Sequence, residues 1–310
     1  MIPFTMPEGS STVARIDEAQ QRQFRERGFI VVENLLPPAR VAEVRRRAEE
    51  IVAGGGNRKP LERFGREGKV VLRKVQSLCS TDAVFSALAH DPLLVDVIEE
   101  LFGEPALIFR DVLVVKPPHD GSKLHWHQDS AYWDIEPPAL ISAWIALTDV
   151  PAAAGSLRFV PGSHKAMLRH SLYWTEKRPM PHAITAMLRK AVSFAGTGDN
   201  PEHAGGNRLL GRIKAGVLEG ASRFVPIMAR LADFRIQDRV VESLGLPDIE
   251  LPVSAGTVIF FHSLLVHSSN PNVSDNARPA PIISYMPQSA RFTGRGKADF
   301  DIARSAAAVR

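Results

Sequence analysis

Cysteine is almost absent from this chain of 310 residues, and that scarcity limits the metal chemistry it can support. Cys79 is the only cysteine. The chain can therefore form no internal disulfide, and it can build neither a thiolate zinc site nor an iron–sulfur cluster from its own residues. If the protein binds a metal, we expect the ligands to be histidine, aspartate or glutamate.

Long hydrophobic runs are also missing. No apolar run approaches the roughly 18 residues that a membrane-spanning helix needs. Residues 1–12 lack a basic stretch followed by an apolar one, which is the pattern of a secretion signal. We therefore expect a soluble, cytoplasmic protein with no membrane partner.

An excess of one charge is likewise lacking. The chain has 38 Lys and Arg against 34 Asp and Glu, a net charge of +4. Its one tight basic run, Arg45 to Arg47, is flanked by Glu43, Glu49 and Glu50, which is typical of a solvated helix face and not of a nucleic-acid-binding stripe. We expect no nucleic-acid partner, and the sequence leaves the oligomeric state open.

The composition is that of a globular protein, and the expected secondary structure changes along the chain. Apolar residues make up 45% and charged residues 23%, which is close to the globular average. The first third favours helices at 14–27, 39–52 and 91–101 with strands at 29–32 and 70–75. From residue 106 short apolar strands separated by Pro and Gly indicate a β-sandwich or barrel, with strands expected at 107–115, 140–147, 157–160, 257–261 and 282–286.

The most informative segment is His125-Trp126-His127-Gln128-Asp129. Alternate residues of a strand share a face, so His127 and Asp129 are expected to project from one strand toward the same point. Two imidazoles and one carboxylate form the facial triad that holds Fe(II) and leaves positions open for other molecules. An isolated His-x-Asp pair also arises easily by chance, so the remaining pattern matters.

A third ligand would have to come from far along the chain. Two candidates, His262 and His267, lie in the second apolar stretch, and His267 is favoured because it follows the predicted strand and precedes a turn. Arg278 comes 11 residues later, just before the last strand. A guanidinium there could bind a carboxylate with two hydrogen bonds, although a surface arginine would fit the sequence equally well.

These motifs, taken in order, resemble the phytanoyl-CoA hydroxylase (PhyH) family of Fe(II)- and 2-oxoglutarate-dependent dioxygenases. The resemblance covers roughly residues 74–286 with an insertion set aside, and the helix–strand–helix opening around residues 28–47 is also typical of the family. The motifs are Lys74-Val75-Gln76, Lys116-Pro117-Pro118, His127-Gln128-Asp129, Ala143-Trp144, Gly155-Ser156-Leu157, Pro161 to Lys165, Phe260 to His267, and Arg278.

The resemblance implies a mainly β fold with flanking helices: a double-stranded β-helix, that is, a cupin-like jelly roll. We expect a single domain over 1–310, with N-terminal support at 14–104 and the jelly-roll core at about 105–165 and 251–290. A helical insertion is expected at about 166–250. This insertion could act as a lid that excludes water, with Trp174 and Phe224 in the pocket.

The resemblance also implies residue roles. His127, Asp129 and His267 would bind iron, and Arg278 would pair with the distal carboxylate of 2-oxoglutarate. The positions of Lys74, Trp144 and Ser269 match family positions near this cosubstrate. Asp129 is present, so a halogenase, in which a small residue replaces the carboxylate, is disfavoured. His125 is expected not to bind the metal.

The implied reaction is hydroxylation of an aliphatic carbon in a small molecule, using O2 and releasing succinate and CO2. The substrate could be acyl-CoA-like or a natural product, and desaturation, epoxidation or ring formation would use the same cofactors. One alternative is a cupin-like metal-dependent isomerase or lyase without 2-oxoglutarate. Another is a non-catalytic β-sandwich binding protein with ordinary interior histidines.

Overall fold

The computed structural model describes residues 16–54, 62–66, 69–119, 122–133, 135–168, 171–173 and 233–292. The chain forms two compact units, residues 1–168 with 238–310 and residues 169–237. In the second unit the described residues form one antiparallel pair, β9 (Ser171–Tyr173) with β10 (Asp233–Arg235). Most of the predicted insertion, including Trp174 and Phe224, lies outside the described residues.

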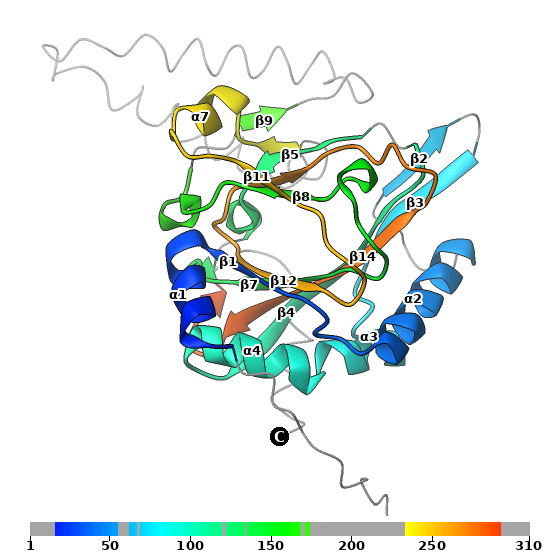
Figure 1. The fold of residues 1–310 in the computed structure, drawn as a ribbon, viewed down its shortest axis with the longest axis horizontal. Coiled ribbons are helices and arrows are strands. Elements are labelled where there is room, and N and C mark those ends of the chain that lie inside the picture. Colours follow the sequence, from blue (N-terminus) through cyan, green and yellow to red (C-terminus); the bar gives the residue numbers. More distant parts are fainter. Residues whose placement is uncertain are drawn as a thin grey trace, which may run out of the picture. The chain divides into compact units, whose positions relative to one another are not determined.

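Two antiparallel sheets of the first unit pack against each other (Figure 1). The larger sheet has the strand order β1 (Phe29–Val32), β12 (Val258–His262), β7 (Ile141–Ile145), β14 (Arg278–Pro287), β4 (Ala106–Lys116), β3 (Lys69–Gln76) and β2 (Glu62–Arg66). The smaller sheet has the order β11 (Ile249–Leu251), β8 (Leu157–Phe159), β13 (His267–Ser269) and β5 (Leu124–His127). A separate pair joins β15 (Arg291–Phe292) to β6 (Ile135–Glu136).

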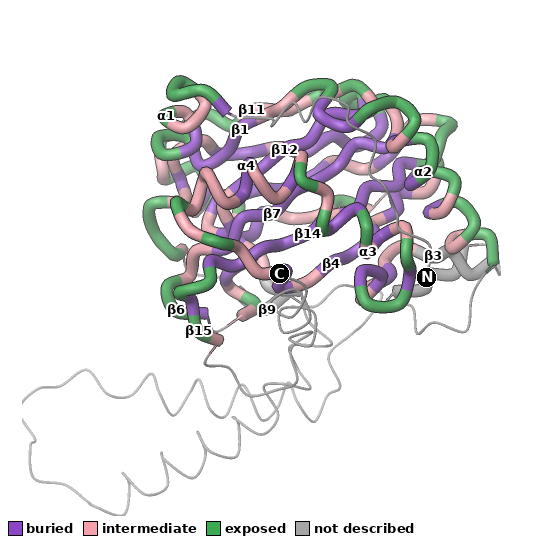
Figure 2. The backbone as a smooth tube through the Cα atoms, turned by 90° about the horizontal axis from the view of Figure 1, so that it is seen from below, coloured by how far each residue is buried: buried purple, intermediate pink, exposed green. Residues whose placement is uncertain are grey.

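Alternation along the strands creates two apolar layers, one on each face of the larger sheet. In β12, Val258 and Phe260 belong to a core on the helix side. Ile259 and Phe261 belong to a second core, which they share with Phe159 of the smaller sheet. The buried strands between these layers are seen in Figure 2. The space between the sheets is therefore closed by side chains from both of them.

Helices cover the outer face of the larger sheet (Figure 1). They are α1 (Glu18–Arg27), α2 (Pro38–Ala53), α3 (Ala83–Ala89) and α4 (Pro92–Phe102), and the short α7 (Asp238–Glu242) follows the second unit in the chain. The boundaries of α4 follow from local chemistry: the Asp91 side chain accepts from the Leu93 N–H, and Gly103 ends the helix in the left-handed conformation. No helix of the described part is long and apolar enough to cross a membrane.

The predicted jelly roll with flanking helices is confirmed. The insertion was expected at about 166–250; the second compact unit spans residues 169–237, and Ile249–Leu251 forms β11 of the smaller sheet. This strand is short and pairs only with β8. Its three residues carry too little alternation to be recognised before the pairing partner is known.

Two glycines that end helices offer a matched test of packing. Gly28 after α1 and Gly103 after α4 both have positive φ, 83° and 73°. A Cβ at Gly28 would lie 2.6 Å from Nδ1 of His164, whereas a Cβ at Gly103 would meet nothing within 4 Å. We expect Gly103→Ala to lower the free energy of unfolding by about 1 kcal/mol, which is the cost of the backbone conformation alone.

We expect Gly28→Ala to lower the free energy of unfolding by more than Gly103→Ala does, because the His164 ring would also have to move. Urea denaturation of both variants measures the difference. Equal losses would show that the contact between Gly28 and His164 is not tight.

Candidate metal centre

Strand pairing brings His127 and His267 together although 140 positions separate them. Strands β5 and β13 pair with His267 directly opposite His127, and residues in that relation share a face of the sheet. The two ring centroids are 4.0 Å apart. Both side chains are buried, at 8% and 5% exposure. The pairing of β5 with β13 therefore brings together two of the three residues of the site.

Asp129 reaches the same point from a different backbone than predicted. The sequence favoured a strand through Asp129, but β5 ends at His127 and Asp129 begins a 3₁₀ turn, residues 129–132. The turn is held by the Ser130 N–H, which donates to the carbonyl of Ser263 at 3.1 Å. Oδ1 of Asp129 lies 3.5 Å from Nε2 of His127 and 3.8 Å from Nε2 of His267.

These three residues form a group that could bind a metal ion. One ligand atom from each lies within 4.8 Å of the others, and the described residues contain no second such group. Two imidazoles and a carboxylate on one side of an ion match the set used by non-haem Fe(II) oxygenases. The residues predicted as ligands are thus brought together.

Backbone carbonyls orient both imidazoles for metal binding. Nδ1 of His127 lies 2.8 Å from the carbonyl of His125, and Nδ1 of His267 lies 2.9 Å from the carbonyl of Leu265. A carbonyl only accepts hydrogen bonds, so each Nδ1 carries a proton and the Nε2 of each ring is the nitrogen left to bind a metal ion. Partners of this kind commonly fix the tautomer of metal-binding histidines.

The charges in the group also suit a cation. Burial opposes ionisation of Asp129, but the charges and the hydrogen bond of His267 and His127, with a contribution from Arg110, lower its pKa to about 2. Burial, followed by the charge of His127, lowers the pKa of His267 to about 4. At neutral pH the group therefore combines one carboxylate with a neutral His267. Sequence reasoning missed the part played by Arg110, which is remote from Asp129 in the chain.

His125 and His262 lie outside this group. His125 contributes its backbone carbonyl, as described. Nδ1 of His262 accepts from the Leu264 N–H at 3.0 Å, and its ring packs near Phe24 and His164. Of the two histidines that the sequence left as candidates, His267 is therefore the one beside Asp129.

Arg278 is a buried cation with unsatisfied donors. It is 2% exposed, and in the part of the chain that the structure describes its Nε and Nη1 have no hydrogen-bond partner. Burial lowers its pKa to about 10, so it stays charged at neutral pH. Its guanidinium lies 5.4 Å from the centre of the Trp144 ring. A buried charge without a partner is costly, so these donors fit a carboxylate brought by a ligand.

The three remaining predicted residues face the space between the sheets. Trp144 belongs to the apolar layer there. Lys74 precedes Val75, which faces the helices, so Lys74 points the other way. Ser269 shares a strand face with His267, and no described residue forms a hydrogen bond with its buried Oγ. All three are therefore on the interior side that also holds Arg278.

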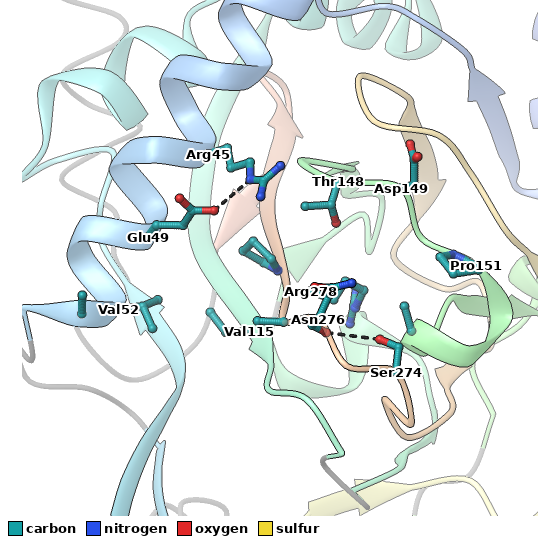
Figure 3. Close-up of a pocket in the computed structure, with 14 residues that line it drawn as sticks. Arg45, Glu49, Val52, Val115, Thr148, Asp149, Pro151, Ser274, Asn276 and Arg278 are labelled. Atoms are coloured by element: carbon teal, nitrogen blue, oxygen red, sulfur yellow. Dashed lines mark hydrogen bonds and ion pairs between the residues drawn. The ribbon is translucent and has the colours of Figure 1, made fainter.

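A cavity of about 620 Å³ borders Arg278 from the side of α2 (Figure 3). Its walls include Arg45 and Glu49 of α2, which form an ion pair at 2.8 Å, and Thr148 and Asp149 from the loop after β7. None of His127, Asp129 and His267 lines it. The cavity thus reaches the arginine without reaching the metal group.

The two histidines of one segment allow a matched test of metal binding. We expect His267→Ala to weaken Fe(II) binding more than about 100-fold, since loss of an outer partner alone commonly costs about 10- to 100-fold. His262→Ala, which removes a partly buried ring outside the group, should retain the affinity. Anaerobic titration of the purified variants at neutral pH measures both. Equal affinities would exclude His267 as a ligand.

Burial of His262 predicts a pH-dependent stability. Burial, followed by the charge of His164, lowers its pKa from 6.5 to about 4. Between these values the unfolded chain binds more protons, so the free energy of unfolding falls as the pH falls from 6.5 toward 4. His262→Gln should reduce this slope by up to about 1.4 kcal/mol per pH unit. Urea denaturation across this pH range measures it, and an unchanged slope would contradict the assignment.

Comparison with known proteins agrees with the geometry. The phytanoyl-CoA dioxygenase (PhyH) family matches residues 24–280. A probable phytanoyl-CoA dioxygenase of Caenorhabditis elegans is 25% identical over 280 residues, which cover 84% of this chain and 73% of that protein. The L-proline trans-4-hydroxylase of Streptomyces griseoviridis is 26% identical over 282 residues, which cover 89% and 88%.

The fold is shared with solved structures. The crystal structure of EctD from S. alaskensis with 2-oxoglutarate and 5-hydroxyectoine aligns with a TM-score of 0.63 at 18% identity, and the alignment covers 96% of this chain and 86% of that one. The resemblance expected from the sequence motifs is confirmed. The chain belongs to the phytanoyl-CoA dioxygenase (PhyH) family, whose members are Fe(II)- and 2-oxoglutarate-dependent dioxygenases.

Proposed function

We propose that this protein hydroxylates an aliphatic carbon of a small molecule, with Fe(II) held by His127, Asp129 and His267 and 2-oxoglutarate held by Arg278. The observation that carries the proposal is the combination of a His-Asp-His group with a buried arginine whose Nε and Nη1 lack hydrogen-bond partners among the described residues. Acidic and histidine ligands on a jelly roll serve many reactions. The unsatisfied arginine is what favours a carboxylate-bearing cosubstrate.

The ligand atoms are already prepared for an ion. His127 and His267 present their Nε2 lone pairs because their Nδ1 protons are donated to carbonyls. Asp129 is ionised, since its pKa is about 2. The bound iron, with 2-oxoglutarate and O2, supplies the oxidising chemistry that yields succinate, CO2 and the hydroxylated product. The protein positions the ligand atoms, provides their charge and excludes water.

Arg278 and its neighbours shape the place of the cosubstrate. Trp144 lies against the guanidinium and restricts its orientation. The buried Oγ of Ser269, on the strand face of His267, is a further donor for a carboxylate oxygen. Lys74 adds a second positive charge on the same interior side. We propose these three as cosubstrate contacts on the basis of that placement.

Apolar rings keep water from the group. The ring centroid of Phe261 lies 4.9 Å from that of His267, and the ring centroid of Phe159 lies 6.2 Å from it. Exclusion of water protects a reactive oxidant from side reactions. On the other side Tyr132, 42% exposed, has its ring 6.2 Å from His127. We propose that the substrate, acyl-CoA-like or a natural product, approaches past Tyr132.

Substitution of the arginine tests the proposal. Arg278→Ala should raise the concentration of 2-oxoglutarate needed for half-maximal succinate release at least about 30-fold, which corresponds to a loss of about 2 kcal/mol for a buried charge pair. Arg158→Ala, which removes a surface ion pair with Asp248, is the control and should leave it unchanged. The measurement is succinate formed from Fe(II), 2-oxoglutarate and O2 during a screen of candidate substrates.

Turnover of a substrate without 2-oxoglutarate or O2 would overturn the proposal in favour of a cupin-like isomerase or lyase. Failure of the wild-type protein to bind Fe(II) would favour the non-catalytic alternative.

A further inference from the structure

Gln128 lies between two of the proposed ligands, yet its own side chain has no place in the mechanism above. It is fully buried at 0% exposure. Because its neighbours His127 and Asp129 point toward the metal group, the extended backbone at Gln128 turns this side chain away from them. Both the nitrogen and the oxygen of its amide form hydrogen bonds, so the side chain connects residues 127–129 to other parts of the chain.

The connections of Gln128 reach two distant stretches of the chain. Its Nε2 donates to the carbonyl of Leu264 at 2.5 Å and to the carbonyl of Ala166 at 2.7 Å. Its Oε1 accepts from the backbone N–H of Leu168 at 2.7 Å. One side chain thus holds three segments, and it does so in a buried place where a lost hydrogen bond is expensive.

The first of these stretches leads directly to the third proposed ligand. Leu264 is followed by Leu265, whose carbonyl orients the His267 ring. Gln128 therefore links the segment that carries His127 and Asp129 to the segment that carries His267. The hydrogen bond from Ser130 Oγ to Ser263 Oγ, at 2.6 Å, joins the same two segments one step further along.

The second stretch, residues 166–168, directly precedes the point at which the chain leaves the first compact unit. Leu168 is its last residue before the unit formed by residues 169–237. Residues 166–168 contain no helix or strand, and the N–H of Leu168 donates to Oε1 of Gln128. Order in this stretch therefore rests in part on the ligand segment.

We propose that Gln128 is a positioning residue that couples metal binding to the order of residues 166–168. An ion that draws His127, Asp129 and His267 into fixed positions also fixes the backbone around Gln128 and Leu264, and with it the amide that holds Leu168. Binding at one place then stabilises the other, and the coupling is reciprocal. This inference rests on the proposed metal site.

The test is backbone amide hydrogen exchange at Leu168, measured anaerobically with and without Fe(II). In the wild-type protein we expect Fe(II) to slow this exchange about tenfold. Gln128→Met, which keeps the length of the side chain but removes its hydrogen bonds, should abolish the dependence on Fe(II). It should also weaken Fe(II) binding, because the coupling between the two places is reciprocal.

Asn272 offers the matched control, because it is a second fully buried amide that holds a loop. Its Nδ2 donates to the carbonyls of Lys116 and Asn276, and its Oδ1 accepts from the Ser274 N–H. Asn272→Leu removes a comparable set of hydrogen bonds without touching residues 127–129 or 264–267. The response of Leu168 to Fe(II) should persist in this variant.

Gln128→Glu covers the case in which Gln128→Met does not fold. It keeps the acceptor for Leu168 and loses both donors, so Leu168 should stay protected while its response to Fe(II) disappears. A wild-type protein that binds Fe(II) with no change at Leu168 would overturn the inference, as would a Gln128 variant with a full response. A wild-type protein that binds no Fe(II) would instead overturn the proposed function.

Discussion

The pairing of β5 with β13 is the constraint on which the site depends. It sets His267 opposite His127, and a slip of one residue would turn one of the two imidazoles to the other face of the sheet. The register is reinforced because β13 pairs on its other edge with β8, where His267 lies opposite Phe159. Three short strands thus fix each other, although none is long enough to be stable alone.

The larger sheet supplies the rigid support for this arrangement. Its helix-side layer is apolar and closed, with Tyr285 of β14 donating to the carbonyl of Ala89 at the end of α3. Its other face carries residues that we propose to contact the cosubstrate, among them Trp144 and Arg278. The division explains how one sheet can be both a core and a binding wall: alternate residues of each strand serve opposite faces.

Polar groups in the interior fall into two kinds. Gln128 and Asn272 have partners for their amides and hold loops in place. Arg278 and Ser269 have buried polar atoms that find no hydrogen-bond partner within the described residues. Because an unsatisfied buried group costs free energy, atoms of the second kind identify where a ligand is expected. Satisfied amides instead mark the places where the backbone needs support.

Buried charge also explains why the site is ready for a cation at neutral pH. Asp129 keeps its charge because His267, His127 and Arg110 lie close to it. Desolvation keeps His267 neutral. The same burial would oppose an isolated carboxylate, so the arrangement of the neighbours decides the outcome.

The sequence by itself determined the local elements, the jelly-roll class and the candidate residues. Strand alternation and helix caps are visible over short stretches because they reflect the periodicity of the local backbone, whereas the jelly-roll class and the role of Arg278 came from the resemblance of the motifs to a family. The tertiary structure alone decided that Asp129 begins a 3₁₀ turn, that His262 points away from the group and that β11 starts at Ile249. It also decided what Gln128 contacts. These outcomes depend on strand register and on backbone groups up to 136 positions away, and such groups leave no periodic pattern in the chain.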